Sequence, residues 1–198
     1  METRRSVVPF EAPQLVGQLI ADRYRVDALL GCGATGAVMR CRHVWLDTDL
    51  AVKVLHPRLC KRAEPMRRFE QEARSASRLD HPNCVRVLDF GSWQAAGIGE
   101  SKYLCMELLW GVELSRLLDH RLGPAFAVDV VGQMLDGLAH AHANGIVHRD
   151  IKPQNVVVVA GGASANTVKI VDFGIAKALT GRDVVAERGV CGTPLYMS

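Results

Sequence analysis

Apolar and polar residues alternate along several short stretches in the first half of the chain. Such alternation predicts β-strands, because successive side chains of a strand point to opposite faces of a sheet. The segments that follow this pattern are YRVDALL (24–30), AVMRC (37–41), LAVKVL (50–55), CVRVLDF (84–90) and KYLCMELL (102–109). A loop is expected over 91–101. Together these stretches predict a small antiparallel sheet.

Two longer stretches carry apolar residues at helical spacing. The first, EPMRRFEQEARSASRL (64–79), has Pro65 in its first turn, where the missing backbone N–H does no harm. The second, PAFAVDVVGQMLDGLAHAHA (124–143), begins at Pro124 and is followed by Gly145, a frequent helix stop. Both segments are therefore predicted to be helices.

Two more short strands, VVVVA (156–160) and TVKIV (167–171), follow the second helix. Strands with one helix, then a helix with short strands, predict an α+β protein with two lobes rather than one sheet. We expect residues 1–21 to be a tail or a loosely docked lead-in. Residues 22–109 form the first lobe and its connection, and residues 110–198 form the second lobe.

The composition is that of an ordinary globular protein with 198 residues and a net charge of +3. The basic run at 61–68 is interpreted as a solvated helix start, so no nucleic-acid partner is expected. Six cysteines without C-x-x-C spacing favour reduced thiols and a cytoplasmic location. No apolar run reaches the roughly 18–20 residues that a membrane-spanning helix needs.

The glycine-rich GCGATGAV (31–38) lies between two predicted strands. A dinucleotide-binding fingerprint of the same form would lie between a strand and a helix, so the context argues against a dinucleotide-binding fold. Two interpretations remain. The stretch is either a flexible hairpin turn or a loop whose backbone N–H groups cover phosphates.

Lys53 lies in the middle of a predicted strand, flanked by valines, where a charge requires a partner. Glu72 follows Phe69 by three residues and precedes Ala76 by four, so it shares the apolar face of the first helix. An inward lysine and an inward glutamate predict a buried ion pair that orients the amine. A purely structural salt bridge is the alternative.

Polar residues are concentrated in GIVHRDIKPQN (145–155), between apolar neighbours. Asp150 and Asn155 in this stretch, with Asp172 at the end of a later strand, supply the oxygen ligands and hydrogen-bond acceptors that Mg²⁺-assisted phosphoryl transfer requires. Each residue alone could form a turn. Their order and combination favour chemistry.

These motifs together resemble the signature set of eukaryotic-type (Hanks-type) Ser/Thr protein kinases. The motifs are G-x-G-x-x-G-x-V, A-V-K, the helix glutamate, H-R-D-x-K-x-x-N, D-F-G and G-T-P-x-Y-M-S. HRDIKPQN and GTPLYMS are similar to the Ser/Thr branch, and LAHAHANGIVHRDIKPQN is similar to bacterial members. The resemblance covers about residues 22–198. It implies a kinase-like fold with a small antiparallel sheet lobe and an incomplete helical lobe.

The resemblance implies a site for ATP. Val38 and Ala51 would sandwich the adenine, Met106 would be the gatekeeper, and 107–109 would be the hinge. Lys53, held by Glu72, would contact the α- and β-phosphates. The residues expected to bind the nucleotide are Leu30, Gly31, Cys32, Gly33, Ala34, Thr35, Gly36, Val38, Ala51, Lys53, Met106, Glu107 and Leu109.

The resemblance also assigns catalytic roles, which add to those of Lys53 and Glu72. Asp150 would accept the proton of the substrate hydroxyl and Lys152 would steady the γ-phosphate. Asn155 and Asp172 would hold Mg²⁺. His148 is expected to be a packing and hydrogen-bonding residue rather than a base.

Partners and regulation follow from the same resemblance. The partners expected are ATP and proteins with Ser or Thr, with dimerisation as a route to autophosphorylation. Thr193 resembles the substrate-site threonine of the family, which leaves Thr180 as the main phosphorylation candidate. Glu187 is hypothesised to mimic a phosphate by pairing with Arg149.

The chain stops within the activation segment, before the Pro-Glu and the later helices of the family. We therefore expect low or no activity, or poor solubility, from this chain alone. The alternative function is an ATP-binding pseudokinase or a truncated regulatory protein. A small-molecule phosphotransferase is disfavoured, because GTPLYMS is typical of enzymes with peptide substrates.

Overall fold

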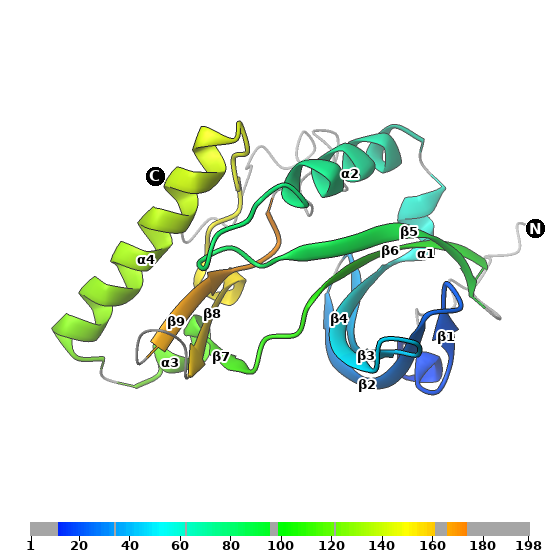
Figure 1. Ribbon diagram of the computed structural model, residues 1–198, viewed down its shortest axis with the longest axis horizontal. Helices are drawn as coiled ribbons and strands as arrows, with labels where there is room; N and C mark the ends of the chain where they lie inside the picture. The colour runs from blue at the N-terminus through cyan, green and yellow to red at the C-terminus, as the bar shows by residue number, and fades with distance from the viewer. Residues whose placement is uncertain are drawn as a thin grey trace, which may run out of the picture.

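A computed structural model describes residues 12–33, 35–61, 63–95, 99–120, 122–160 and 166–173. Ala34, Thr180, Glu187 and Thr193 lie outside these residues, so the expectations about them stay predictions. The described elements form two groups (Figure 1). The chain after β6 (Gly99–Glu107) connects them, and the segment between α2 (Ala63–Ala76) and β5 (Val87–Ala95) contacts both. One group is a broad sheet with α2 above it, and the other contains α4 (Pro124–Ala143) and three short strands.

The first lobe is a six-stranded sheet in which every neighbouring pair is antiparallel, in the order β1-β2-β3-β4-β6-β5. Its strands are β1 (Leu19–Ile20), β2 (Tyr24–Gly33), β3 (Gly36–His43), β4 (Thr48–Leu55), β5 (Val87–Ala95) and β6 (Gly99–Glu107). The antiparallel sheet predicted from the alternation is confirmed.

The alternation along β4 divides its side chains between two cores. Ala51 and Leu55 contribute to the core beneath α2, whereas Val52 and Val54 contribute to the core on the other face. Lys53 has the same parity as Ala51, so it points to the α2 side of the sheet. The strand period therefore determines which face carries the amine.

Residues 12–20 are part of this lobe, which differs from the tail or loose lead-in expected from the sequence. The 3₁₀ helix η1 (Ala12–Leu15) precedes β1, and the side chains of Leu15 and Ile20 are fully buried. They complete the core on the face of the sheet opposite α2, the outer core, which also contains Val52, Val54 and Trp93. Two apolar residues are too few to give a periodic signal in the sequence.

The prediction of a loop over 91–101 is also wrong for most of that stretch. β5 and β6 continue as a hairpin in which Ser92 pairs with Lys102 and Trp93 with Ser101. Trp93 packs into the outer core, and the Ser101 hydroxyl donates a hydrogen bond to the Leu55 carbonyl at 2.8 Å. The polar and glycine residues that suggested a loop are tolerated because this hairpin forms the edge of the sheet.

Helix α1 (Pro57–Cys60) and helix α2 (Ala63–Ala76) follow β4. The buried face of α2 carries Phe69, Ala73 and Ala76, which join the core that contains Leu104 and Phe173. Phe173 belongs to the segment after β9 (Asn166–Ile170), drawn in orange, which runs toward α2 (Figure 1). The predicted helix over 64–79 therefore exists and is slightly shorter at its C-terminal end.

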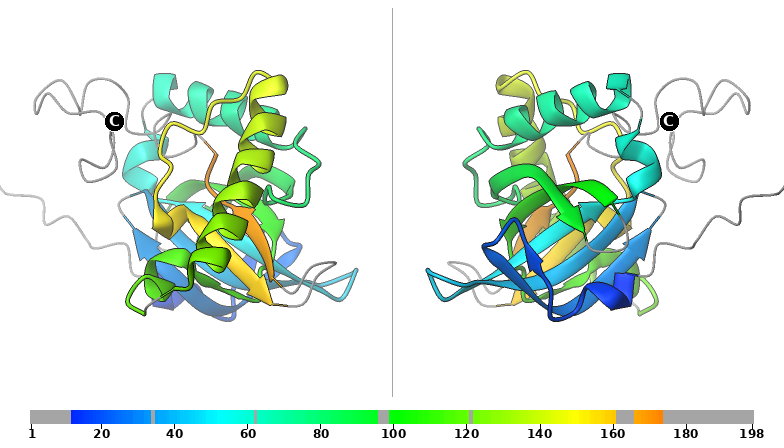
Figure 2. Two further views of the ribbon diagram at one scale, coloured as in Figure 1. Left: turned by 90° about the vertical axis from the view of Figure 1, so that its left-hand side faces the viewer. Right: turned by 90° about the vertical axis from the view of Figure 1, so that its right-hand side faces the viewer.

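The second lobe combines one long helix with a three-stranded antiparallel sheet in the order β7-β8-β9. Its elements are β7 (Gly111–Glu113), α3 (Leu114–Leu117), α4 (Pro124–Ala143), η2 (Pro153–Asn155), β8 (Val156–Ala160) and β9 (Asn166–Ile170). Helix α4 has the bounds that the sequence predicted. It lies across β8 and β9 when viewed from the side of the second lobe (Figure 2).

One face of α4 is apolar and exposed. Val128, Val131 and Leu135 point outward, whereas Val130, Gly137 and Ala141 are buried. Among the described helices, none is long and apolar enough to cross a membrane.

The segment between α2 and β5 connects the lobes through backbone contacts with β9. The Val85 N–H donates to the Ile170 carbonyl and the Ile170 N–H donates to the Asn83 carbonyl, both at 2.9 Å. Gly137 of α4 lies against Asn83, where a Cβ would be 3.0 Å from the Asn83 Cβ. These contacts anchor β9 and α4 to the first lobe at one place.

Candidate active site

Lys53 and Asp172 form a short ion pair between the two lobes. The Lys53 Nζ donates to Asp172 Oδ2 at 2.7 Å across 119 positions of sequence. The Lys53 side chain is only 5% exposed and the Asp172 side chain 27%. A lysine this deeply buried needs a counter-charge, and the carboxylate after β9 supplies it.

The predicted pair between Lys53 and Glu72 is not formed. Glu72 Oε1 instead accepts a hydrogen bond from Arg149 Nη1 at 3.2 Å. Helical periodicity correctly placed Glu72 on the inward side of α2. It could not decide between two cations, because Arg149 approaches from a loop 77 positions away.

Three polar side chains meet in the loop before β8. Asp150 Oδ2 accepts from Lys152 Nζ at 2.7 Å and from Asn155 Nδ2 at 3.2 Å. Asn155 Nδ2 also donates to the Asp150 backbone carbonyl at 2.8 Å. The loop therefore holds the Asp150 carboxylate between an ammonium and an amide, in a fixed orientation.

His148 holds this loop against the end of β9 through two hydrogen bonds. It is buried, its Nε2 lies 2.8 Å from the Val171 carbonyl, and its Nδ1 accepts from the Asp150 N–H at 3.3 Å. Burial is the main reason that the pKa of His148 lies below its ordinary value. A neutral imidazole that donates from Nε2 and accepts at Nδ1 agrees with a supporting role rather than with a base.

Two residues of the site have left-handed backbone conformations. Arg149 has a φ of 65° and Asp172 a φ of 62°. Such conformations are uncommon for residues with a side chain, and they are retained where the surrounding contacts outweigh the strain. Here those contacts include the Arg149–Glu72 and Lys53–Asp172 ion pairs and the hydrogen bond that the Val171 N–H donates to the Asn155 carbonyl at 2.9 Å.

The glycine-rich turn between β2 and β3 combines open and crowded positions. A Cβ on Gly31 or Gly33 would meet nothing within 4 Å, which leaves room for a ligand beside the backbone. A Cβ on Gly36 would overlap the Val54 carbonyl oxygen, and its φ is 154°. Gly36 is thus required by packing on β4. Leu30 and Cys32 are exposed at this turn, and Thr35 bonds to His56 through its carbonyl.

The residues expected around an adenine lie on adjacent strands. Ala51 pairs with Met106 across β4 and β6, and both belong to the core beneath α2. Val38 and Leu109 are partly buried against that core. Within the described residues the Leu109 N–H has no hydrogen-bond partner, so it can donate to a ligand.

Sequence reasoning missed Lys169, whose Nζ donates to Glu107 Oε1 at 2.7 Å. Lys169 lies in TVKIV between the buried Val168 and Ile170. A lysine flanked by β-branched residues in a strand was the signal that identified Lys53. The same signal would have identified Lys169 and its need for a partner.

The donor set fits a magnesium ion that is bound jointly with phosphates. The described residues contain no cluster of three or more His, Cys, Asp or Glu side chains that could hold a metal by itself. The side-chain amide nitrogen of Asn155 donates to Asp150, so the side-chain oxygen of Asn155 can serve as a metal ligand. Asp172 adds a carboxylate. Mg²⁺ characteristically takes one or two such ligands and completes its shell with phosphates and water.

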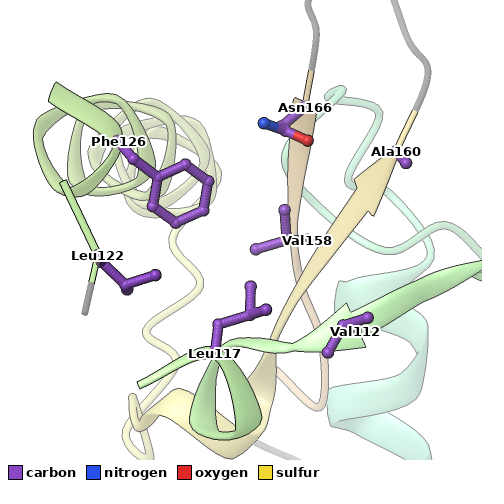
Figure 3. A pocket seen from close by; sticks show the side chains of 7 residues that line it. All are labelled: Val112, Leu117, Leu122, Phe126, Val158, Ala160 and Asn166. Atoms are coloured by element: carbon purple, nitrogen blue, oxygen red, sulfur yellow. The ribbon is translucent and has the colours of Figure 1, made fainter. Parts of the chain in front are cut away.

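A separate cavity of about 340 Å³ lies in the second lobe, between α3, α4 and the small sheet (Figure 3). It is lined by Val112, Leu117, Leu122, Phe126, Val158, Ala160 and Asn166. None of these side chains is titratable, so the cavity lacks the groups that phosphoryl transfer requires.

The ion pair between Lys53 and Asp172, the cluster of Asp150, Lys152 and Asn155, and the two-lobed fold are typical of the protein kinase domain, and a family comparison agrees. The model of the protein kinase domain matches residues 24–198. The chain therefore belongs to the protein kinase domain family, as the sequence motifs predicted.

Several curated bacterial relatives are similar to the chain. It is 39% identical over 194 residues to the serine/threonine-protein kinase pkn3 of Myxococcus xanthus, covering 95% of this chain and 35% of the relative. It is 38% identical over 185 residues to PknA of Mycobacterium tuberculosis, covering 92% and 42%. It is 36% identical over 186 residues to PrkC of Bacillus subtilis, covering 93% and 27%.

Solved structures confirm the two-lobed fold. The crystal structure of the Mycobacterium tuberculosis PknI kinase domain superposes with a TM-score of 0.69 at 30% identity, covering 81% of this chain and 63% of that chain. The chain thus spans less than two thirds of the solved kinase domain and less than half of each curated relative above.

Proposed function

We propose that this chain binds Mg²⁺·ATP and provides the nucleotide-binding and catalytic-loop part of a Ser/Thr protein kinase. The observation that carries the proposal is the convergence of Lys53 with Asp172 at 2.7 Å, beside a loop in which Lys152 and Asn155 hold Asp150. This set combines cations for phosphates, oxygen ligands for a metal and one oriented carboxylate. The names of the curated relatives support the same assignment.

The proposed nucleotide site extends from the glycine-rich turn to the hinge. Val38 and Ala51 enclose the adenine with Leu30, and Met106 limits its depth. The Leu109 N–H and the carbonyl of Glu107 are the hinge groups offered to the adenine edge. The glycine turn, residues 31–36, covers the phosphates with backbone N–H groups.

In the proposed reaction, Lys53 moves its ammonium from Asp172 to the α- and β-phosphates. Asn155 and Asp172 hold Mg²⁺, which neutralises charge on the phosphates when it is bound. Asp150 accepts a hydrogen bond from the substrate Ser or Thr hydroxyl. It takes the hydroxyl proton as the hydroxyl oxygen bonds to the γ-phosphorus and the bond from that phosphorus to the β-phosphate oxygen breaks, which releases ADP. Lys152 leaves Asp150 Oδ2 for the γ-phosphate oxygens, which lowers the repulsion that the attacking oxygen meets.

A transfer assay with γ-labelled ATP and a Ser/Thr protein substrate tests this proposal. Asp150→Asn retains the shape of the loop but cannot take a proton, so phosphate transfer falls while Mg²⁺·ATP affinity is kept. Transfer by the Asp150→Asn variant at the unchanged rate would refute the role of Asp150. Absence of any Mg²⁺·ATP binding to the unmodified chain would refute the function as a whole.

Partners beyond ATP are also proposals. Protein substrates with Ser or Thr are supported by the kinase family, and the five described cysteines are free thiols, which supports a cytoplasmic location. Dimerisation for autophosphorylation is supported by the hairpin tip between β3 and β4, where Trp45 and Leu46 are exposed. Sedimentation of the chain and of its Trp45→Ser variant tests the dimer.

A second candidate is an ATP-binding protein that transfers no phosphate. The observation that favours it is Glu72, which is bound to Arg149 rather than to the lysine. In this alternative, Mg²⁺·ATP raises the melting temperature of the chain, and the transfer assay gives no product with any substrate.

A further inference from the structure

Lys169 occupies the junction between three segments that are far apart in sequence. Its Nζ donates to Glu107 Oε1 at 2.7 Å and to the Cys84 carbonyl at 3.3 Å. Its side chain is 17% exposed, although it lies on a short strand at the border of the second lobe. An ammonium held by a carboxylate and a backbone carbonyl is fixed in direction as well as in position.

Glu107 is fixed by the same junction. Its Oε1 also accepts from the Arg86 N–H at 2.7 Å, and its own N–H donates to the Arg86 carbonyl at 3.0 Å. The last residue of β6 is therefore bonded both to the segment after α2 and to β9. Neither the side chain nor the backbone of Glu107 can shift without breaking one of these bonds.

The junction lies between the two ends of the proposed nucleotide site. Glu107 begins the hinge span 107–109, and Lys169 precedes Asp172 by three residues on the same strand and its extension. Adenine and Mg²⁺-bound phosphates belong to one molecule, so the hinge and Asp172 must stay at one separation to bind both. The ion pair between Lys169 and Glu107 links the hinge directly to the strand that leads to Asp172.

We propose that Lys169, acting through Glu107, is a positioning residue that sets the spacing between the hinge and Asp172. The inference rests on the proposed binding of Mg²⁺·ATP. Breaking the Lys169–Glu107 pair should lower affinity for some ligands and not for others. The adenosine half and the phosphate half of the nucleotide each keep their own contacts when this pair, called the clamp below, is broken. Only the linked ligand, which needs both halves in register, loses affinity.

The test measures affinity by competition against a fluorescent ATP analogue, with three ligands: adenosine, Mg²⁺·tripolyphosphate and Mg²⁺·ATP. In Lys169→Met we expect Mg²⁺·ATP to bind about 5- to 10-fold more weakly, with adenosine and Mg²⁺·tripolyphosphate unchanged within about twofold. Lys169→Arg keeps a donor for Glu107 and restores most of the loss. Glu107→Gln, which retains an acceptor for the Arg86 N–H, gives a smaller loss in the same direction.

Lys102 offers a matched control. Its side chain is 18% exposed and pairs with Glu70 at 3.0 Å, but it lies away from the hinge. Lys102→Met therefore removes an ion pair of similar burial and leaves the affinity for Mg²⁺·ATP unchanged. Thermal unfolding of every variant shows whether it is folded, and Lys169→Arg and Glu107→Gln keep the test decisive if Lys169→Met does not fold.

Two outcomes overturn the inference while the proposed function stands. One is an unchanged Mg²⁺·ATP affinity in Lys169→Met and Glu107→Gln. The other is an equal loss for adenosine and Mg²⁺·ATP, which would mean that the clamp shapes the hinge alone. If the unmodified chain does not bind Mg²⁺·ATP at all, the proposed function fails first and the inference falls with it.

Discussion

Among the described residues, two lysine–carboxylate pairs cross between the lobes near β9, with the lysine on opposite sides of the junction. Lys53 reaches from the first lobe to Asp172, whereas Lys169 reaches from β9 to Glu107 at the end of β6. Both N–O distances are 2.7 Å. Equal distances therefore do not distinguish the two pairs.

Their surroundings do distinguish them. The Lys169–Glu107 pair is accompanied by bonds to the Cys84 carbonyl and to the Arg86 N–H. The Lys53 ammonium has Asp172 as its one ion-pair partner in the described part of the chain. A pair with few other bonds can be redirected to a ligand, whereas a pair embedded in backbone bonds keeps its geometry. We infer that the first pair serves the nucleotide and the second maintains the frame.

The largest effect is expected from removing the amine of the pair assigned to the nucleotide. Lys53→Met keeps the length of the side chain and should lower phosphate transfer by about 100- to 1000-fold, because one preorganised cation for the phosphates is lost. Steady-state kinetics of phosphate transfer measures the loss. The matched change Lys169→Met should lower transfer far less, and equal losses would erase the distinction between the two pairs.

Removing the carboxylates should separate the pairs by their cost in stability. Asp172→Ala leaves Lys53, 5% exposed, without its counter-charge and should lower the free energy of unfolding by about 3 kcal/mol. Glu107→Ala leaves Lys169 with the Cys84 carbonyl and should cost about 1–2 kcal/mol. Urea denaturation measures both values. A larger cost for Glu107→Ala would contradict the greater burial of the Lys53 pair.

Lowering the pH should destabilise the segment between Lys169 and Asp172, which joins the two ion pairs. Burial lowers the pKa of His148, which bonds to Val171 between Lys169 and Asp172. The folded state therefore prefers neutral His148, and stability is complete above about pH 6.5 and falls as pH decreases below it. Between pH 7 and pH 5, His148 should add up to about 1.4 kcal/mol per pH unit to the slope of the free energy of unfolding against pH. In His148→Gln this part of the slope should disappear.

The exposed His142 on α4 provides the control for that experiment. His142→Gln should leave the slope of stability against pH as it is in the unmodified chain. If both variants have the same slope, protonation of His148 does not contribute to acid unfolding.

The smallest effect is expected for the third interlobe pair, between Arg149 and Glu72. The Arg149 side chain is 49% exposed, so water and salt screen the interaction. Glu72→Gln should change the free energy of unfolding by less than about 1 kcal/mol, and the difference should shrink in 0.5 M salt. A loss as large as that of Asp172→Ala would show that exposure is a poor guide to these pairs.

Local patterns in the sequence predicted much of this molecule. The period of β4 placed Lys53 inward, and Pro124 with Gly145 bounded α4 correctly. The motifs around Asp150 and Asp172 identified the family, which the comparisons confirm. These features depend on residues close together in the chain, so their signals survive without coordinates.

Pairings between distant segments could not be predicted in the same way. The inward face of α2 was correct, but the partner of Glu72 depends on how α2 sits against a loop 77 positions later. Lys169 was missed because its partner was considered only for its backbone. The strand residues at 91–95 and 99–101 could not be predicted because they are largely polar, and their place in the sheet depends on the burial of Trp93 in the outer core.

The most direct test of the central claim is the Mg²⁺ dependence of ATP affinity in the unmodified chain and in Asp172→Asn. If Lys53 and Asp172 act on one nucleotide, Mg²⁺ should strengthen ATP binding to the unmodified chain by at least tenfold and have little effect on Asp172→Asn. An equal strengthening by Mg²⁺ in both proteins would contradict the assignment of Asp172 to the metal and remove the basis for the proposed site.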